Sequence, residues 1–346
     1  MLQWLIEILI IYWPITILTA ISWHQGWGPI PGAILGGVIW WLYTRRPAEI
    51  PAVIPTPMPA PHANASANIA IQNFAADNAA HQQASVRGVP EILSELNSLI
   101  GLAEAKQAIA EILATVQASR AREAQGLAPI VQSLHCAFTG APGTGKTIVA
   151  RLLGELFCAV GVFPGRPVFV EVTKSDLVAG FVGQTATKVR SICAAATGGV
   201  LFVDEAYSLM PSDQGHDFAA EALSELIVRM EDGRRHFCVI LAGYPKEIDA
   251  LIRSNPGMES RLSFRVQFAD YTSEELTQIA ERELQRRQYG YCPDVLVAIR
   301  SRIARHGGKL PGNGRDIRGW VEQAIRNAAV SGRIDTIIPD DINDRR

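Results

Sequence analysis

The chain has 346 residues, 48% of them apolar, and a formal net charge of −2. This length and apolar content allow more than one domain and a sizeable core. The near balance of charge argues against a nucleic-acid partner, because no basic excess is present to neutralise phosphate backbones. The five cysteines stand apart without metal-ligand spacing, which predicts reduced structural thiols in a reducing compartment.

The first 46 residues predict a membrane anchor. Leu2–Trp23 is one apolar segment, which as a helix would span about 33 Å, enough for a bilayer core. A second, shorter apolar segment covers Trp27–Tyr43, and Arg45 and Arg46 after it mark the cytoplasmic side. We therefore expect a transmembrane hairpin in a bacterial inner membrane, with the rest of the chain cytoplasmic. A cleaved signal peptide is the alternative, but the segment lacks a basic start and the second apolar segment would be unexplained.

Residues 47–89 are predicted to form a linker. Six prolines between positions 47 and 61 favour an extended, semi-rigid stalk. The Ala, Asn and Gln residues that follow show no apolar periodicity, which is typical of a segment without a packed core. An apolar pattern of helical spacing begins at Glu91, so the folded part of the chain is expected over 90–346.

The stretch GAPGTGKT at 140–147 matches a phosphate-binding loop in full. A β-prone run precedes it and a helical pattern follows it, which is the setting that such a loop requires. Its backbone N–H groups are expected to surround phosphate oxygens, with Lys146 at the β- and γ-phosphates and the Thr147 hydroxyl on Mg²⁺. The residues predicted to bind nucleotide are Gly140, Ala141, Pro142, Gly143, Thr144, Gly145, Lys146 and Thr147.

A second element of the same kind lies at 200–205. Val200–Val203 is predicted to be a strand buried on both faces of a parallel sheet, and two acids follow at its carboxyl end. Asp204 is expected to hold Mg²⁺ through water, and Glu205 to polarise an attacking water. The prediction that the chain hydrolyses the nucleotide, rather than only binding it, therefore depends on Glu205. Two exposed loop acids without function are the alternative.

Further strand-like runs occur at 168–172, 237–241 and 265–268, with helical patterns between them. They predict an α/β domain over 90–270, built on a P-loop NTPase parallel sheet with helices on both faces. The sequence Thr272-x-x-Glu275 is a capping box that starts a helical stretch. A smaller α-helical domain is therefore expected over 271–346.

Seven motifs then occur in a fixed order: LIGL at 99–102, GAPGTGKT at 140–147, GFVGQTA at 180–186, GGVLFVDEAYSL at 198–209, ILAGY at 240–244, NPGMESR at 255–261 and GNGRDIR at 312–318. In this order and spacing the chain resembles the AAA+ ATPases, and within them the CbbX/CfqX group, which includes red-type Rubisco activases. The resemblance covers residues 90–346. It implies ATP and Mg²⁺ as cofactors, a helical lid and a homo-oligomer in the form of a hexameric ring.

The resemblance also implies roles for single residues. Ile100 and Gly101 match the segment that lies against the adenine. Arg261 resembles the arginine finger that reaches a neighbouring subunit's γ-phosphate, and Arg315 resembles the sensor 2 arginine of the lid. A surface ion pair is the alternative for both arginines. Tyr244 stands where many AAA+ proteins carry Asn as sensor 1, and it is either a nucleotide contact or a core tyrosine.

Phe181, Val182 and Gly183 align with the aromatic–apolar–glycine pore loop of AAA+ rings. Six copies pointing into a central channel would grip an extended chain by apolar contact, which does not depend on the sequence gripped. The alternative is that Phe181 packs on its own domain or at a subunit contact.

These predictions together describe a membrane-anchored, ring-forming ATPase that remodels or threads an unidentified protein substrate. Two alternatives stay open: an ATP-gated membrane scaffold of a secretion or conjugation apparatus, and a nucleic-acid motor. Intact Glu205 and Arg261 favour the remodelling motor over the scaffold. Rubisco activation itself is not expected, because a hydrophobic hairpin has no evident use with a soluble substrate.

Overall fold

The computed structural model describes residues 87–129, 133–181, 183–210 and 218–342. All of them belong to one compact unit of the chain. The predicted hairpin at 1–46, the predicted linker up to residue 86 and Val182 of the predicted pore loop lie outside the described residues.

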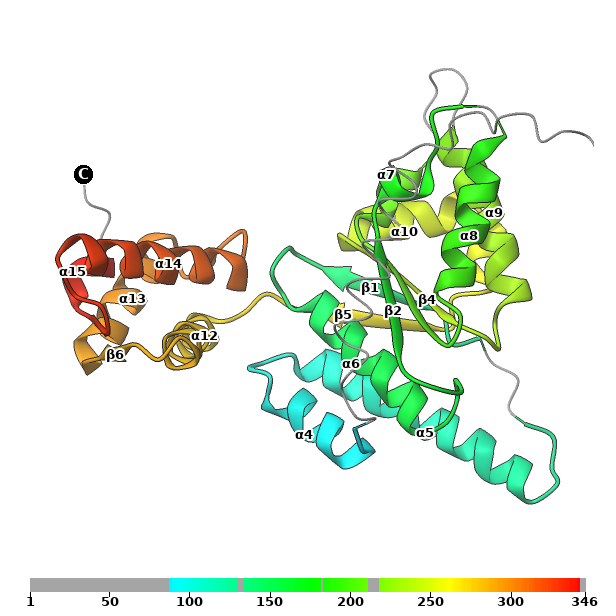
Figure 1. Ribbon diagram of the computed structural model, residues 1–346, viewed down its shortest axis with the longest axis horizontal. Coiled ribbons are helices and arrows are strands. Elements are labelled where there is room, and N and C mark those ends of the chain that lie inside the picture. Colours follow the sequence, from blue (N-terminus) through cyan, green and yellow to red (C-terminus); the bar gives the residue numbers. More distant parts are fainter. Residues whose placement is uncertain (1–86, 130–132, 182, 211–217, 343–346) are drawn as a thin grey trace, which may run out of the picture. The chain divides into compact units, whose positions relative to one another are not determined.

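Five parallel strands form the centre of the fold (Figure 1), in the spatial order β2-β3-β4-β1-β5. Their bounds are β1 (Cys136–Gly140), β2 (Val168–Val172), β3 (Gly199–Val203), β4 (Cys238–Gly243) and β5 (Phe264–Phe268). All pairings are parallel, so the carboxyl ends of the strands lie along one edge of the sheet. The predicted parallel sheet is confirmed, and the phosphate-binding loop leaves this edge from β1 near its centre.

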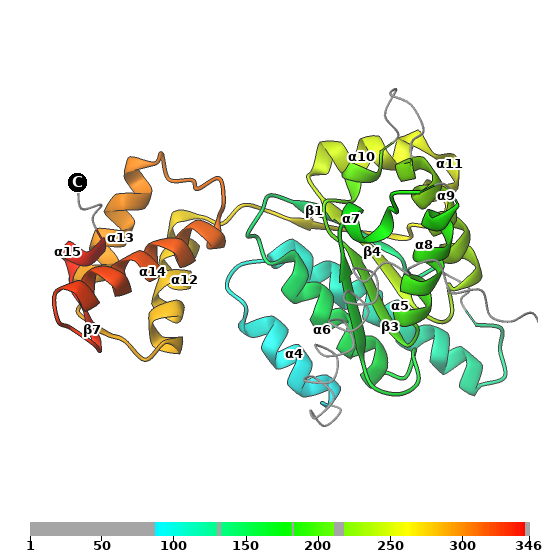
Figure 2. The ribbon, with the colours of Figure 1, turned by 45° about the horizontal axis from the view of Figure 1, so that its top comes forward.

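Successive residues of the strands enter two separate cores on opposite faces of the sheet. Phe138 and Phe202 pack in one core, and their neighbours Ala137 and Leu201 pack in the other. The helices of the first face are α4 (Val89–Ser98), α5 (Ala103–Ala124) and α6 (Lys146–Ala159), and those of the second are α8 (Gln184–Ala195), α9 (Phe218–Asp232) and α10 (Pro245–Ser254). Figure 2 shows the two helical layers with the sheet between them. Every residue of β3 is buried, as its unbroken apolar run predicts.

The chain becomes helical after β5, as predicted, and forms the lid. Its elements are α12 (Ser273–Arg286), α13 (Pro293–Arg305), α14 (Gly314–Val330), α15 (Pro339–Ile342) and a short parallel pair, β6 (Gly290–Tyr291) with β7 (Thr336–Ile337). The predicted capping box starts α12: Thr272 Oγ1 accepts from the Glu275 N–H at 3.2 Å, and Glu275 Oε2 accepts from the Thr272 N–H at 2.8 Å. The β6–β7 pair was not predicted, because two-residue strands leave no periodic pattern. Three short elements complete the described part: α7 (Lys174–Leu177), η1 (Ala206–Leu209) and α11 (Pro256–Glu259).

The predicted membrane location needs correction. Within residues 87–342, outside the gaps given above, no helix is both long and apolar enough to cross a bilayer. The longest of these helices, α5, carries six charged residues among its 22, which a membrane span does not tolerate. The predicted membrane location is corrected on this finding, and the two apolar segments on which it rested, within 1–46, lie outside the described residues.

Four cysteines are buried, as predicted for structural thiols: Cys136, Cys158, Cys193 and Cys238. Burial raises the pKa of Cys158 to about 11 and that of Cys193 to about 12. These thiols therefore stay protonated near neutral pH and behave as small apolar side chains. Cys292 is exposed.

Candidate active site

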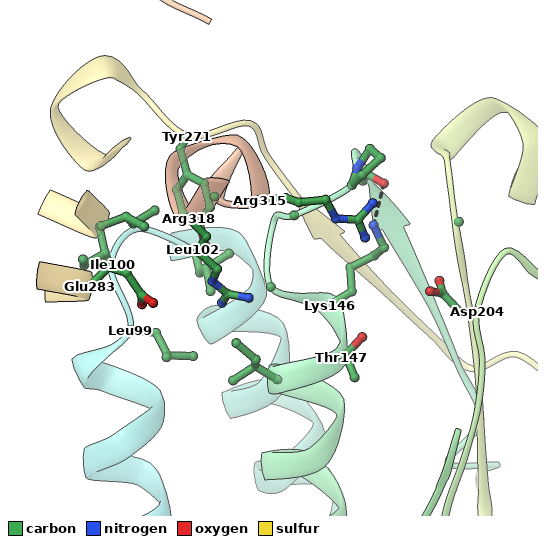
Figure 3. A pocket seen from close by; sticks show the side chains of 18 of the residues that line it. Leu99, Ile100, Leu102, Lys146, Thr147, Asp204, Tyr271, Glu283, Arg315 and Arg318 are labelled. Atoms are coloured by element: carbon green, nitrogen blue, oxygen red, sulfur yellow. Dashed lines mark hydrogen bonds between the residues drawn. The ribbon is translucent and has the colours of Figure 1, made fainter. Parts of the chain in front are cut away.

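A cavity of about 370 Å³ opens at the carboxyl ends of the strands, between the phosphate-binding loop and the lid (Figure 3). Its walls include many of the predicted site residues: Ile100, Gly140, Pro142, Gly143, Gly145, Lys146, Thr147, Asp204, Glu205, Tyr244 and Arg315. Gly101, Ala141 and Thr144 belong to the same segments but do not line it. Arg261, Phe181 and Gly183 lie elsewhere. The structure thus brings the predicted nucleotide residues together and separates them from the predicted finger and pore loop.

Two glycines of the phosphate-binding loop have backbone angles that favour glycine. Gly143 has φ of +70° and Gly145 has φ of +96°. A Cβ on Gly143 would also collide with the carbonyl oxygen of Gly312 in the lid. The lid holds the loop through two hydrogen bonds: the Gly314 N–H donates to the Gly143 carbonyl at 3.2 Å, and the Tyr271 hydroxyl donates to the Thr144 carbonyl at 3.2 Å.

Two cationic side chains lie at the phosphate-binding end of the cavity. The Lys146 amine donates to the carbonyls of Gly140 and Ala141, both at 2.8 Å. Burial lowers the pKa of Lys146; Arg315 acts in the same direction, and Asp204 opposes it. Figure 3 shows Arg315 reaching toward Lys146 from the lid. Two cations beside the backbone of a glycine-rich loop suit a polyphosphate.

Thr147 and Asp204 supply the oxygen atoms that could hold Mg²⁺. Both side chains line the same end of the cavity (Figure 3). The Asp204 N–H donates to the Val172 carbonyl at 2.8 Å, which fixes the start of this turn against the neighbouring strand. In the described residues no three His, Cys, Asp or Glu side chains cluster for a metal. A hydroxyl and one carboxylate fit Mg²⁺, which protein sites bind through few side chains together with substrate phosphates.

Glu205 adopts a backbone conformation that is rare for a residue with a side chain. Its φ and ψ are 49° and 41°, in the left-handed region, and its N–H donates to Asp204 Oδ1 at 3.0 Å. Such a conformation costs on the order of 1–3 kcal/mol and is found chiefly at functional sites. The turn directs the chain from β3 into η1 and keeps Glu205 at the cavity wall.

Tyr244 lines the cavity beside a tyrosine that sequence reasoning missed. It is 39% exposed, so it is not a core tyrosine. Its ring lies 5.9 Å from that of Tyr207, centroid to centroid, at 46°. Tyr207 also lines the cavity, three residues after Asp204. The signal available in the sequence was the aromatic residue in the DEAY stretch, next to the two acids.

Sequence reasoning also missed a set of lid residues in the cavity wall. They are Tyr271, Ile279, Arg282, Glu283, Arg286 and Arg318. Ile279, Glu283 and Arg286 recur at four- and three-residue spacing, so they share one face of α12. Arg318 follows Arg315 by three residues on α14 and therefore lies on the same face of that helix. Helical spacing was the available signal, but it does not say which face meets the nucleotide.

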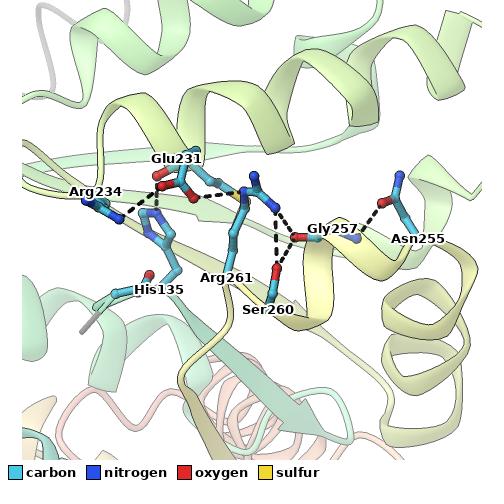
Figure 4. A network of polar contacts seen from close by, with 9 residues as sticks. His135, Glu231, Arg234, Asn255, Gly257, Ser260 and Arg261 are labelled. Carbon is cyan, nitrogen blue, oxygen red and sulfur yellow. Dashed lines mark hydrogen bonds and ion pairs between the residues drawn. The ribbon is translucent and has the colours of Figure 1, made fainter. Parts of the chain in front are cut away.

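Arg261 lies outside the cavity, in a polar network of its own chain (Figure 4). Its Nε is 3.3 Å from Glu231 Oε2, and its NH1 donates to the Gly257 carbonyl at 2.6 Å. Glu231 also pairs with Arg234 at 3.0 Å. The ion pair considered as the alternative is therefore present within the chain. Arg261 does not line the cavity of its own chain.

His135 is a buried histidine beside this network. It is 1% exposed, and its Nδ1 accepts from the Val239 N–H at 2.9 Å, so Nε2 carries the proton and donates to the Met230 carbonyl at 2.8 Å. Burial lowers the pKa of His135 to about 4; Arg261 adds to this effect, while the Met230 hydrogen bond and Glu231 oppose it. The imidazole is neutral in the fold at neutral pH.

Acidification is therefore expected to destabilise the protein through His135. An unfolded histidine titrates near pH 6.5 and the folded one near 4, so the unfolded chain binds more protons in this window. Stability is unaffected above about pH 6.5 and falls as the pH drops toward 4. Between pH 7.5 and 5 this one residue should remove about 2 kcal/mol of unfolding free energy.

Urea unfolding of the wild type and of His135→Gln at both pH values measures this contribution. Glutamine can accept from Val239 and donate to Met230, so the variant should keep the fold and lose about 2 kcal/mol less on acidification. His236→Gln, at an exposed position, is the control and should follow the wild type. Equal losses in the wild type and His135→Gln would show that His135 does not carry the effect.

Comparison with known proteins supports a nucleotide site. Residues 136–268 match the model of the ATPase family associated with various cellular activities (AAA), and residues 272–341 match that of the AAA lid domain. The chain is 40% identical over 256 residues to protein CbbX of Cereibacter sphaeroides, an alignment covering 72% of this chain and 82% of that protein. It is 38% identical over 238 residues to the chloroplastic ribulose bisphosphate carboxylase/oxygenase activase of Cyanidioschyzon merolae, covering 68% and 81%. The crystal structure of the FIGL-1 AAA domain shares the fold, with a TM-score of 0.51, 22% identity and coverage of 71% and 80%.

Proposed function

Because the chain belongs to the AAA ATPase family and is homologous to remodelling ATPases of the CbbX and Rubisco activase type, we propose that it works as a ring of identical subunits that remodels a protein substrate. Members of this family hydrolyse ATP, and this chain is an ATPase. The ring, its six-fold number, the roles of single residues and the substrate class belong to the proposal.

The proposed hydrolytic roles follow the geometry of the cavity. Lys146 from the loop and Arg315 from the lid hold the phosphates, and Glu205 orients and polarises the attacking water. Thr147 and Asp204 would hold Mg²⁺, which neutralises charge on the phosphate oxygens. Arg261 of an adjacent subunit would supply the remaining positive charge at the transition state.

The exposure of Phe181 is the single observation that carries the remodelling proposal. The side chain is 65% exposed, so it does not pack on its own domain. Added Cβ atoms on Gly180 and Gly183 would meet nothing within 4 Å, which indicates open space around the loop between α7 and α8. An aromatic side chain held in water is costly unless a partner covers it. A protein chain gripped by non-directional apolar contact is such a partner.

Phe181→Ala is expected to keep basal ATP hydrolysis within about twofold of the wild type and to lose substrate remodelling. Truncating an exposed side chain changes stability by roughly 0.5 kcal/mol or less, whereas truncating a core Phe costs about 3–5 kcal/mol. Thermal melting and ATPase assays on the full chain distinguish these cases before any substrate is known. A much lower melting temperature together with lost basal hydrolysis would show that Phe181 is a packing residue.

Substrate capture tests whether Phe181 holds the substrate protein. Glu205→Gln with ATP should retain substrate proteins from the native cell, and Glu205→Gln/Phe181→Ala should release them. Phe181→Tyr keeps an aromatic ring and should preserve capture. Ile334→Ala, which truncates an 84% exposed side chain of the lid, is the matched control and should also preserve it. Equal capture with and without Phe181 would contradict the pore proposal.

A further inference from the structure

Glu283 places a buried carboxylate at the end of the cavity that is remote from the phosphate-binding loop. In Figure 3 the labelled side chains run from Asp204, Thr147 and Lys146 at one end to Leu99, Ile100 and Glu283 at the other. Glu283 comes from α12, lines the cavity and is 7% exposed. Leu99, Ile100 and Ile279 give this end an apolar wall. A flat purine base would therefore lie here when its phosphates occupy the opposite end.

The Glu283 carboxylate is ionised and has one oxygen available. Arg286 NH2 and Arg287 Nε both donate to Oε1 at 2.8 Å. Within the described residues no hydrogen bond to Oε2 is present. Burial by itself would raise the pKa of Glu283, but the two arginine hydrogen bonds outweigh it and lower the pKa below its ordinary value. An ionised carboxylate offers only acceptors to a ligand.

We infer that Glu283 selects the base of the nucleotide: its available oxygen accepts a hydrogen bond from the 6-amino group of adenine and excludes purines with a 6-oxo group. The 6-amino group of adenine is a donor, whereas O6 of guanine and hypoxanthine is an acceptor. A 6-oxo base in the position of adenine would set two acceptors against each other; its N1–H lies beside O6, so the base would have to shift within the cavity to offer that donor to Glu283, which disfavours it. The inference rests on the proposed nucleotide site.

Besides Arg315, three arginines line the cavity, and two of them, Arg282 and Arg286, are bound to other groups. Arg282 NH1 donates to the Ser98 carbonyl at 2.6 Å, which directs it to α4. Arg286 is 70% exposed along its side chain and is bound to Glu283 Oε1. In Figure 3 the Arg318 side chain lies between the Glu283 end of the cavity and Lys146. Glu283 is the acidic side chain at this end of the cavity, opposite Asp204.

Competition against a ribose-labelled fluorescent ATP analogue, with Mg²⁺ and the full chain, tests the inference. The competitors are ATP, ITP, which carries O6 without the 2-amino group of GTP, and purine riboside triphosphate, which has no 6-substituent. Wild type should bind ATP about tenfold to a hundredfold tighter than ITP, with purine riboside triphosphate in between. In Glu283→Gln the ATP-to-ITP ratio should fall to about threefold or less, because a carboxamide can also donate to O6.

Glu322→Gln is the matched control. Glu322 binds Arg287 at 2.9 Å in the same network but does not line the cavity, so this variant should keep the wild-type ratio. A wild type that binds ITP as tightly as ATP would overturn the inference whether or not Glu283→Gln folds. So would a folded Glu283→Gln that keeps the wild-type ratio. A wild type that binds none of the three nucleotides would overturn the proposed function itself, and this inference with it.

Discussion

Glu205→Gln is expected to bind ATP with near wild-type affinity and to hydrolyse it about 10²- to 10⁴-fold more slowly. The proposed phosphate contacts come from Lys146, Arg315 and the loop backbone, so binding does not depend on the Glu205 charge. The carboxylate is proposed to accept a proton from the attacking water, and a carboxamide cannot do so. Single-turnover hydrolysis and nucleotide binding, measured on the same sample, separate the two effects.

Glu123→Gln is the matched control for this variant. Glu123 is an exposed acid near the end of α5 and does not line the cavity, so its replacement should leave turnover unchanged. The backbone at Glu205 is strained, and glutamine has no better access to this conformation than glutamate. A similar melting temperature should therefore accompany the loss of turnover. Turnover within tenfold of the wild type would show that another group activates the water.

Arg261→Ala is expected to retain ATP binding and to lose turnover by about 10³- to 10⁵-fold, the usual contribution of an arginine finger. Arg261 does not line its own chain's cavity, so binding should not change. Arg261→Ala and Lys146→Ala, each inactive alone, should recover activity when mixed. In mixed rings an intact cavity in one subunit would meet an intact Arg261 in the next. ATPase activity against mixing ratio measures this complementation.

Arg234→Ala is the matched control, because Arg234 also pairs with Glu231 in the network of Figure 4. If Arg261 serves only that network, the two variants should lose stability and activity alike. If it acts on a neighbour's nucleotide, only Arg261→Ala should lose turnover. Wild-type turnover in Arg261→Ala, or failure of the mixed sample to recover, would contradict the finger assignment.

Much of the fold is predictable from the sequence, because its causes are local. The apolar run Val200–Val203 can only be buried on both faces, and the structure buries all of β3. Gly143 and Gly145 adopt positive φ angles that other residues rarely take, so the phosphate-binding loop is already evident in the glycine spacing. The capping box at Thr272 fixes the start of α12 within four residues. Each of these features depends on neighbours along the chain.

Other features depend on contacts between distant segments, and these only the tertiary structure decided. Helical spacing groups Ile279, Glu283 and Arg286, but the packing of the lid determines that this face meets the cavity. Arg261 is bound to Glu231, thirty positions earlier, and no local pattern predicts that pair. By itself the sequence determined the five strands of the large sheet, the start of α12 and the phosphate-binding loop, because short-range sterics and apolar periodicity fix them. The lid side of the cavity and the partners of Arg261 were decided by long-range packing, which brings together residues whose spacing along the chain carries no signal.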